Sequence, residues 1–171
     1  MLNLSPILTL IAEALKIYLP AMVANATPVF LKQGKPLDLG AKFIDGKRVL
    51  GDGKTFEGLA IGLFFGTYSG IIETLVFKNL LFIRIGLIAS IGALLGDIFG
   101  SFIKRRLGLK RGDPAPILDQ LDFIYGATFL LYLIGVTVTL EKFIAIQVIT
   151  LILHIVTNRI AYVLKLKPVP W

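Results

Sequence analysis

Acidic, hydroxyl and basic side chains recur at helical spacing in residues 96–105 (GDIFGSFIKR). Asp97, Ser101 and Lys104 stand at positions i, i+4 and i+7, so one helix face would present a carboxylate, a hydroxyl and an ammonium group. This face begins inside an apolar segment, where a carboxylate is unfavourable unless it is paired, hydrated or bound to a cation. Asp97 could simply pair with a basic neighbour at the membrane edge, but intramembrane ionisable residues are functional by default, so we take it as a site residue.

Two further carboxylates, Asp119 and Asp122, stand three residues apart at the end of residues 108–122 (GLKRGDPAPILDQLD). On a helix this spacing places both on one face. Acids at a helix N-terminus also complement the helix dipole and cap its free amides, and this structural interpretation stays open. Because Asp122 borders an apolar run and carboxylate oxygens suit Mg²⁺, we expect Asp97, Asp119 and Asp122 to hold Mg²⁺ together with substrate phosphates.

Glycines and a Lys-Thr pair form a polar loop within residues 50–58 (LGDGKTFEG). Glycines let backbone amides approach a phosphate, and the Lys-Thr pair would add a charge and a hydroxyl. The loop does not fit the Walker P-loop, because that motif requires glycine where this chain has Arg48. An ordinary polar turn before a helix is the alternative. We expect phosphate contacts from Gly51, Asp52, Gly53, Lys54 and Thr55.

Five apolar segments are long enough to cross a bilayer and to position these motifs. A hydrocarbon core about 30 Å thick needs roughly 20 apolar residues in a helix. We predict spans at about 6–31, 59–77, 80–103, 123–140 and 143–164 in one transmembrane domain, residues 1–171. The first span could tilt, bend at Pro20 or break near Asn25, where freed backbone groups could face a ligand. The predicted fold class is an all-α integral membrane protein.

Basic residues gather in three segments that five spans would place on the same side of the membrane. Loops 32–58 and 104–122 and the tail after residue 164 hold thirteen of the eighteen Lys and Arg residues: Lys32, Lys35, Lys42, Lys47, Arg48, Lys54, Lys104, Arg105, Arg106, Lys110, Arg111, Lys165 and Lys167. Basic loops stay in the cytoplasm. We therefore predict a multi-pass cell-membrane protein with its N-terminus outside, its C-terminus and both long loops cytoplasmic, and its site facing the cytoplasm.

The composition excludes several classes of protein. Hydrophobic residues make up 56% of the chain and charged residues 17%, against roughly 45–50% and about 25% in soluble domains. The net charge of +7 could suggest nucleic acid, but basic residues beside apolar spans more often set membrane orientation, so we expect no nucleic-acid partner. The absence of cysteine excludes disulfides, thiolate metal sites and cysteine nucleophiles.

The charged motifs resemble the signature of the CTP-dependent phosphatidate cytidylyltransferases, the CDP-diacylglycerol synthases. The matching residues are Gly96, Asp97, Ser101, Lys104, Arg105, Gly108, Lys110, Asp119 and Asp122. The short length, the five spans, Asn25-Ala-x-Pro28 and the loop at 51–55 are more similar to the archaeal branch of that family, the CDP-archaeol synthases. The broader signature commonly has a Lys-Asp pair and a His-Gly-Gly run, whereas residues 110–113 here read KRGD without a histidine.

The resemblance implies transfer of CMP from CTP to an isoprenoid ether lipid, 2,3-di-O-geranylgeranylglyceryl phosphate, with Mg²⁺ as cofactor and pyrophosphate as product. The expected catalytic residues are Asp97, Lys104, Asp119 and Asp122. The expected CTP or phosphate contacts are Asn25, Gly51, Asp52, Gly53, Lys54, Thr55, Ser101, Arg105 and Lys110. A homodimer could cover remaining apolar surface.

Three other functions are compatible with parts of the sequence. A phosphatidate acceptor and a small ion-coupled transporter both stay open on the residues alone. A CDP-alcohol phosphotransferase is disfavoured, because its Asp-Gly-x-x-Ala-Arg motif is absent from the chain.

Overall fold

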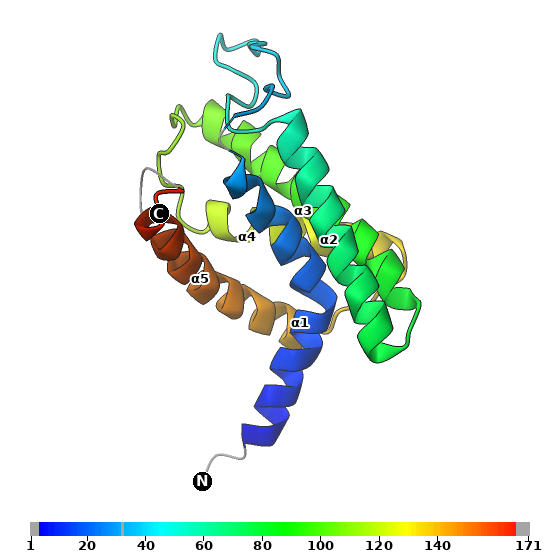
Figure 1. Ribbon diagram of the computed structural model, residues 1–171. Helices are drawn as coiled ribbons and strands as arrows, with labels where there is room; N and C mark the ends of the chain where they lie inside the picture. Colours follow the sequence, from blue (N-terminus) through cyan, green and yellow to red (C-terminus); the bar gives the residue numbers. More distant parts are fainter. Residues whose placement is uncertain (1–3, 32, 167–171) are drawn as a thin grey trace.

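The computed structural model describes residues 4–31 and 33–166, and these residues fold into a bundle of helices (Figure 1). The elements are α1 (Leu4–Ala26), the short 3₁₀ turn η1 (Thr27–Phe30), α2 (Phe56–Phe77), α3 (Leu81–Arg106), α4 (Leu118–Leu133) and α5 (Leu140–Val163). Lys32 and Lys167, two of the cations counted above, lie outside the described residues. The prediction of an all-α chain is confirmed.

Four helical segments of the described chain are long and apolar enough to cross a membrane. They are Ser5–Phe30, Phe56–Phe77, Leu81–Arg106 and Leu140–Val163. Each agrees within a few residues with the first, second, third or fifth predicted span. The α1 helix continues through Pro20 and ends at Ala26, one residue after Asn25.

The fourth helix differs from its prediction. The sequence predicts a span at about 123–140, whereas α4 (Leu118–Leu133) begins earlier, ends earlier and has only 16 residues. Its end is set by Gly135, which adopts a φ of +82° while the Val136 amide bonds back to the Leu131 carbonyl at 3.0 Å. This is the usual glycine stop of a helix. The apolar sequence continues beyond that stop, so hydropathy alone concealed the end of the helix.

Glycine stripes let the helices approach one another closely. Gly62, Gly66 and Gly70 recur every fourth residue on a buried face of α2, and glycines recur in the same way on α3. A Cβ atom at Gly66 would lie 2.2 Å from the Ser90 hydroxyl, and one at Gly92 would lie 2.5 Å from a carbonyl of α4. Small residues at this spacing are typical of packed membrane helices. They allow α3 to pack against α1, α2 and α4.

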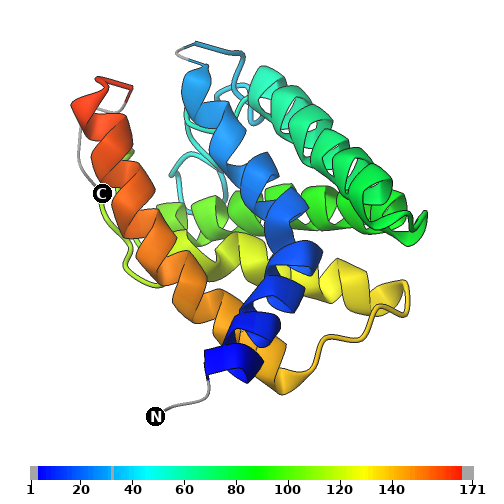
Figure 2. The same ribbon diagram turned by 60° about the horizontal axis from the view of Figure 1, so that its bottom comes forward.

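The ends of these elements bring the predicted motifs to one end of the bundle. The loop between η1 and α2 lies beyond the N-terminus of α2 and the C-terminus of α3 (Figure 1). The α5 helix crosses α1 near its own N-terminal end, and its C-terminal half extends toward the connection between α3 and α4 (Figure 2). The candidate residues therefore meet where the helices end.

Candidate active site

The loop between η1 and α2 is folded around one buried carboxylate, that of Asp38. Its oxygens accept hydrogen bonds from the amides of Gly40, Leu50 and Gly51 at 3.2, 3.0 and 2.9 Å and from the Arg48 guanidinium at 2.6 and 3.1 Å. Arg48 and the amides hold the pKa of Asp38 well below its usual range, against the opposing effect of burial. The carboxylate therefore stays charged into acidic pH. This network, which we call the Asp38 clamp, closes the loop that carries Lys54.

Arg106 attaches this loop to the C-terminal end of α3. Its guanidinium lies 3.1 Å from the Asp45 carboxylate and stacks over the rings of Phe43 and Phe102 at 4.7 and 4.8 Å. Lys47 Nζ donates to the Arg106 carbonyl at 2.9 Å. A guanidinium over aromatic rings and beside a carboxylate gains from both contacts. The polar loop is thus held against α3.

Lys54 reaches from the loop to α3. Its Nζ lies 2.5 Å from Asp97 Oδ2, and the two side chains are only 23% and 26% exposed. The next residue, Thr55, is the N-cap of α2, and its hydroxyl accepts a hydrogen bond from the Gly58 amide at 3.0 Å. This cap fixes the chain directly after Lys54. The structure therefore joins two motifs that the sequence shows only as separate segments.

Lys104 joins α3 to the first turn of α4. Its Nζ lies 2.8 Å from Asp119 Oδ1. The other oxygen of Asp119 accepts a hydrogen bond from the Ala115 amide at 3.0 Å. Asp119 therefore bonds to the chain just before α4, and not to an amide of its first turn, while it also meets a predicted site residue.

Asp122 lies within electrostatic reach of both pairs. The charges of Asp97, Lys54 and Asp119 all act on its carboxylate. The carboxylate fits against α3 because residue 100 is glycine: a Cβ atom there would lie 2.1 Å from Asp122 Oδ2. Asp122 therefore lies near the Lys54–Asp97 pair and near Asp119.

The remaining loop residues bring further cations to this end of α3. Gly51 is buried, adopts a φ of +90°, and packs beside the Arg105 side chain. Asp52 pairs with Arg48 at 2.9 Å, and Gly53 lies beside Arg111. The loop thus lies beside two arginines, and guanidinium groups are well suited to bind phosphates.

The other predicted contacts lie around this cluster. Ser101 is half-buried on α3 between Asp97 and Lys104 in sequence. The Lys110 side chain is exposed, and its carbonyl accepts a hydrogen bond from Arg105 at 3.3 Å. Asn25 occupies the last turn of α1, before the η1 turn whose Pro28 packs near the start of α2.

The acids of the cluster do not form a preformed metal cage. Among the residues that the structure describes, no group of three or more His, Cys, Asp and Glu side chains could hold a metal ion. Two of the predicted ligands, Asp97 and Asp119, are paired with lysines. Mg²⁺ is usually bound by one or two carboxylates together with substrate phosphates. The carboxylates of Asp97 and Asp122, which act on each other electrostatically, fit that smaller donor set.

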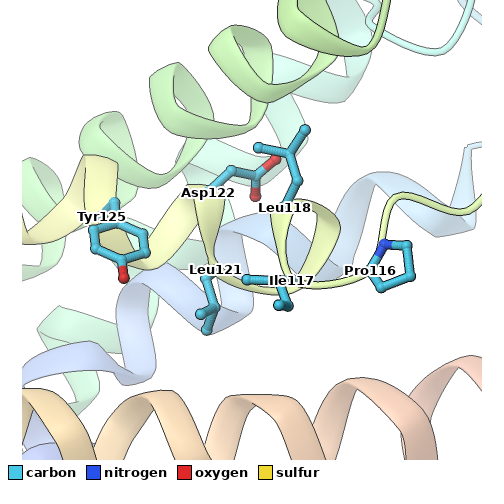
Figure 3. A pocket seen from close by; sticks show the side chains of 6 residues that line it. All are labelled: Pro116, Ile117, Leu118, Leu121, Asp122 and Tyr125. Atoms are coloured by element: carbon cyan, nitrogen blue, oxygen red, sulfur yellow. The ribbon is translucent and has the colours of Figure 1, made fainter. Parts of the chain in front are cut away.

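Two cavities flank the start of α4. One of about 330 Å³ is lined by Pro116, Ile117, Leu118, Leu121, Asp122 and Tyr125 (Figure 3). The other, of about 370 Å³, is lined by Pro114, Ala115, Pro116, Asp119, Gln120, His154, Ile155, Asn158 and Arg159. Each cavity therefore includes one of the two acids of α4.

Sequence reasoning assigned no role to the Asp38 clamp or to the polar residues of α5. The partners of Asp38 are mostly backbone amides, which no side-chain pattern reveals. The His154 ring bonds to the Asn158 amide, with 2.9 Å between Nδ1 and Nδ2. The polar residues of α5 could have been recognised in the sequence, because residues 154, 158 and 159 are polar or charged within an otherwise apolar segment.

Comparisons with known proteins find matches that cover nearly the whole chain. The family model described as CarS-like, CDP-archaeol synthase, matches residues 7–171. A CDP-archaeol synthase of Sulfurisphaera tokodaii is 50% identical over 166 residues, which cover 97% of this chain and 99% of the relative. One of Sulfolobus acidocaldarius is 52% identical over 154 residues, covering 90% and 94%. A solved structure described as an intramembrane enzyme for archaeal membrane lipids biosynthesis superposes with a TM-score of 0.83 and 45% identity, covering 86% of this chain and 94% of that one.

Proposed function

Because the chain belongs to the CDP-archaeol synthase family, we propose that it transfers the cytidylyl group of CTP to the phosphate of an isoprenoid ether lipid, 2,3-di-O-geranylgeranylglyceryl phosphate. The family resemblance drawn from the motifs is confirmed. The observation that carries the proposal is the pairing of Lys54 with Asp97 and of Lys104 with Asp119, within electrostatic reach of Asp122. These contacts gather a basic loop and three acids at one end of membrane-spanning helices.

The reaction forms one phosphorus–oxygen bond and breaks another. An oxygen of the lipid phosphate attacks the α-phosphorus of CTP, and the bond from that phosphorus to the oxygen bridging to the β-phosphate breaks. Pyrophosphate leaves, and the CDP-linked lipid remains. A phosphate monoester is already anionic near neutral pH, so no serine or histidine nucleophile is required. The main task of the protein is to bring two polyanions together and to neutralise the leaving group.

The cations of the cluster would perform that task. Lys54 would exchange its contact with Asp97 for the nucleotide phosphates, which approach over the Gly51–Thr55 loop. Arg105 lies beside Gly51 and would contact the same phosphates, with Lys110, Ser101 and Asn25 around them. Lys104, held by Asp119 at 2.8 Å, would stabilise charge developing at the reacting phosphate.

Asp97 and Asp122, with Asp119 beside them, would hold Mg²⁺ together with phosphate oxygens. When bound, the ion supplies positive charge that offsets the charge of the triphosphate and of the departing pyrophosphate. The support for this proposal is the chemistry of the donors: hard carboxylate oxygens of two helices, one of them seated in the space left by Gly100.

The proposal also includes the orientation of the protein. The site would face the cytoplasm, with the N-terminus outside, because the long loops carry most of the lysines and arginines. A homodimer would cover part of the exposed apolar surface of the helices.

The test is turnover by the purified chain in detergent. CTP and Mg²⁺ are supplied with either the geranylgeranyl ether lipid phosphate or a diacyl phosphatidate, and CDP-lipid and pyrophosphate are measured together. We expect both products in equal amounts with the ether lipid. Faster turnover with phosphatidate would show that phosphatidate is the acceptor. If neither lipid gave pyrophosphate, the enzymatic proposal would be refuted, and an ion-coupled transporter would remain as the alternative function.

A further inference from the structure

The cavity of about 370 Å³ between the start of α4 and the C-terminal half of α5 combines a cation with hydrogen-bonding groups. Arg159, Asn158 and His154 line it from α5, and Gln120 and Asp119 line it from α4. Asn158 is only 7% exposed although it lies in an apolar helix. Among the described residues, no carboxylate pairs with the Arg159 guanidinium. Such a lining suits an anion that also accepts hydrogen bonds.

This polar cavity adjoins an apolar one. Pro116 lines both cavities. Figure 3 shows Ile117 and Leu121 on the side of α4 away from the side to which Asp122 points, with Tyr125 one turn further along. Together the two cavities follow α4 from a polar end at Asp119 to an apolar end at Tyr125. Their combined lining matches a molecule with a charged head and a hydrocarbon chain.

The position of the cavities relative to the cluster indicates which substrate they would take. The polar loop that would bind CTP reaches the acids through Lys54, which contacts α3. The polar cavity meets Asp119 from the side of α5, where Ile152, Val156 and Ile160 are exposed. Exposed apolar side chains on a membrane-spanning helix face lipid. An occupant of the cavities would therefore arrive from the bilayer.

We infer that these two cavities are the binding site for the phosphorylated head and first chain segments of the lipid substrate, with Arg159 as the residue that recognises its phosphate. The inference rests on the proposed function. Arg159 would hold the phosphate in a two-pronged contact, and Asn158 and Gln120 would bond to the glycerol oxygens. The acceptor phosphate would thus be presented to Asp119 and Asp122 from α5 while CTP lies on the loop side of α3.

The first test separates lipid binding from nucleotide binding in steady-state kinetics. Arg159→Gln is expected to raise the KM for the ether lipid phosphate at least about tenfold, because each hydrogen bond of the two-pronged contact is charge-assisted, while the KM for CTP stays unchanged. Lys165→Gln removes a cation just beyond the same end of α5 that lines neither cavity, and it should leave both constants unchanged. A raised KM for CTP, or an unchanged KM for the lipid, would overturn the inference.

The second test requires no turnover. The thermal unfolding of the full chain in detergent is followed with the ether lipid phosphate, with the same lipid lacking phosphate, and with inorganic phosphate. We expect stabilisation by the lipid phosphate alone, lost in Arg159→Gln and in Ile155→Trp, which fills the cavity, and kept in Val156→Trp on the neighbouring exposed position. If the wild-type chain made no CDP-lipid but showed this pattern, the proposed function would fail and the lipid site would stand. Equal stabilisation of all variants would refute the site itself. If Arg159→Gln does not fold, the two tryptophan variants decide, and equal stabilisation of Ile155→Trp and Val156→Trp would refute the site.

Discussion

Lys54 and Lys104 each neutralise a carboxylate that the proposed reaction needs. Without substrate these contacts balance charge that would otherwise be unfavourable near the membrane. The types and spacing of Asp97, Asp119 and Asp122 were sufficient to make these residues candidates in the sequence. The partner of each was not, because Lys54 and Asp97 are 43 positions apart and only the packing of the loop on α3 joins them.

Asp97→Asn should lower kcat about a hundredfold or more, because it removes a charge from the reacting centre while it keeps a hydrogen-bond acceptor for Lys54. CDP-lipid formation with radiolabelled CTP measures the loss, and circular dichroism checks the helices. Glu141→Gln, in the first turn of α5 at the other end of the bundle, is the matched control and should retain activity. Near-normal turnover in Asp97→Asn would contradict the assignment.

Lys54→Ala should act mainly on CTP. Loss of one charge-assisted contact to a phosphate should raise the apparent KM for CTP about tenfold. The exposed Lys42 lies in the same loop, and Lys42→Ala should leave that KM unchanged. An equal KM for CTP in Lys54→Ala and Lys42→Ala would show that Lys54 does not contact the nucleotide.

The helices that are defined by their hydropathy were predicted well from the sequence. Features that depend on backbone geometry were not. Spans one, two, three and five are recognisable by length and hydropathy. The end of α4 depends on a positive φ at Gly135, and the Asp38 clamp depends on backbone amides, so neither follows from a hydropathy window. The glycine stripes were visible in the sequence, but their role as space for Asp122 requires the helix pairing.

Gly100→Ala tests that role. The added methyl group would meet the Asp122 carboxylate at 2.1 Å, and a carboxylate can turn aside, so we expect activity to fall more than thermal stability. In Gly92→Ala the methyl group meets the backbone of α4 at 2.5 Å, which cannot yield without moving a helix. That variant should lose thermal stability first. Melting temperature and kcat measured on both variants check the contrast, and equal losses in both would contradict it.

The Asp38 clamp predicts a pH dependence. Because the folded pKa of Asp38 is lowered by Arg48, its stabilising effect is fully present above the unfolded pKa of about 4 and is lost progressively as pH falls from there toward the lower folded pKa. Proteolysis at residues 42–48 of the loop, by proteases active at each pH and corrected for their cleavage of an unfolded substrate, should therefore stay slow from neutral pH to about pH 5 and accelerate only below about pH 4. Asp38→Asn should accelerate it at neutral pH as well. Equal rates for both chains at neutral pH would exclude the clamp.

At the scale of the whole molecule, the proposed orientation can be tested cleanly because the chain contains no cysteine. Single cysteines placed at Ile44 in the first long loop and at Leu80 between α2 and α3 occupy exposed positions. In intact cells a membrane-impermeant maleimide should label only Leu80→Cys, and after lysis it should label both. Labelling of Ile44→Cys in intact cells would invert the proposed topology.

The shortness of α4 has an energetic consequence for the proposed reaction. Sixteen residues in helix extend about 24 Å, less than the roughly 30 Å of hydrocarbon in a bilayer. The surrounding leaflet can therefore thin on this side of the protein, which would bring the proposed nucleotide site closer to the level of the acyl layer. Pulling a chain out of the leaflet costs about 0.8 kcal/mol per methylene, so even ten carbons amount to about 8 kcal/mol. A reaction carried out at this depth leaves both hydrocarbon tails where they already are.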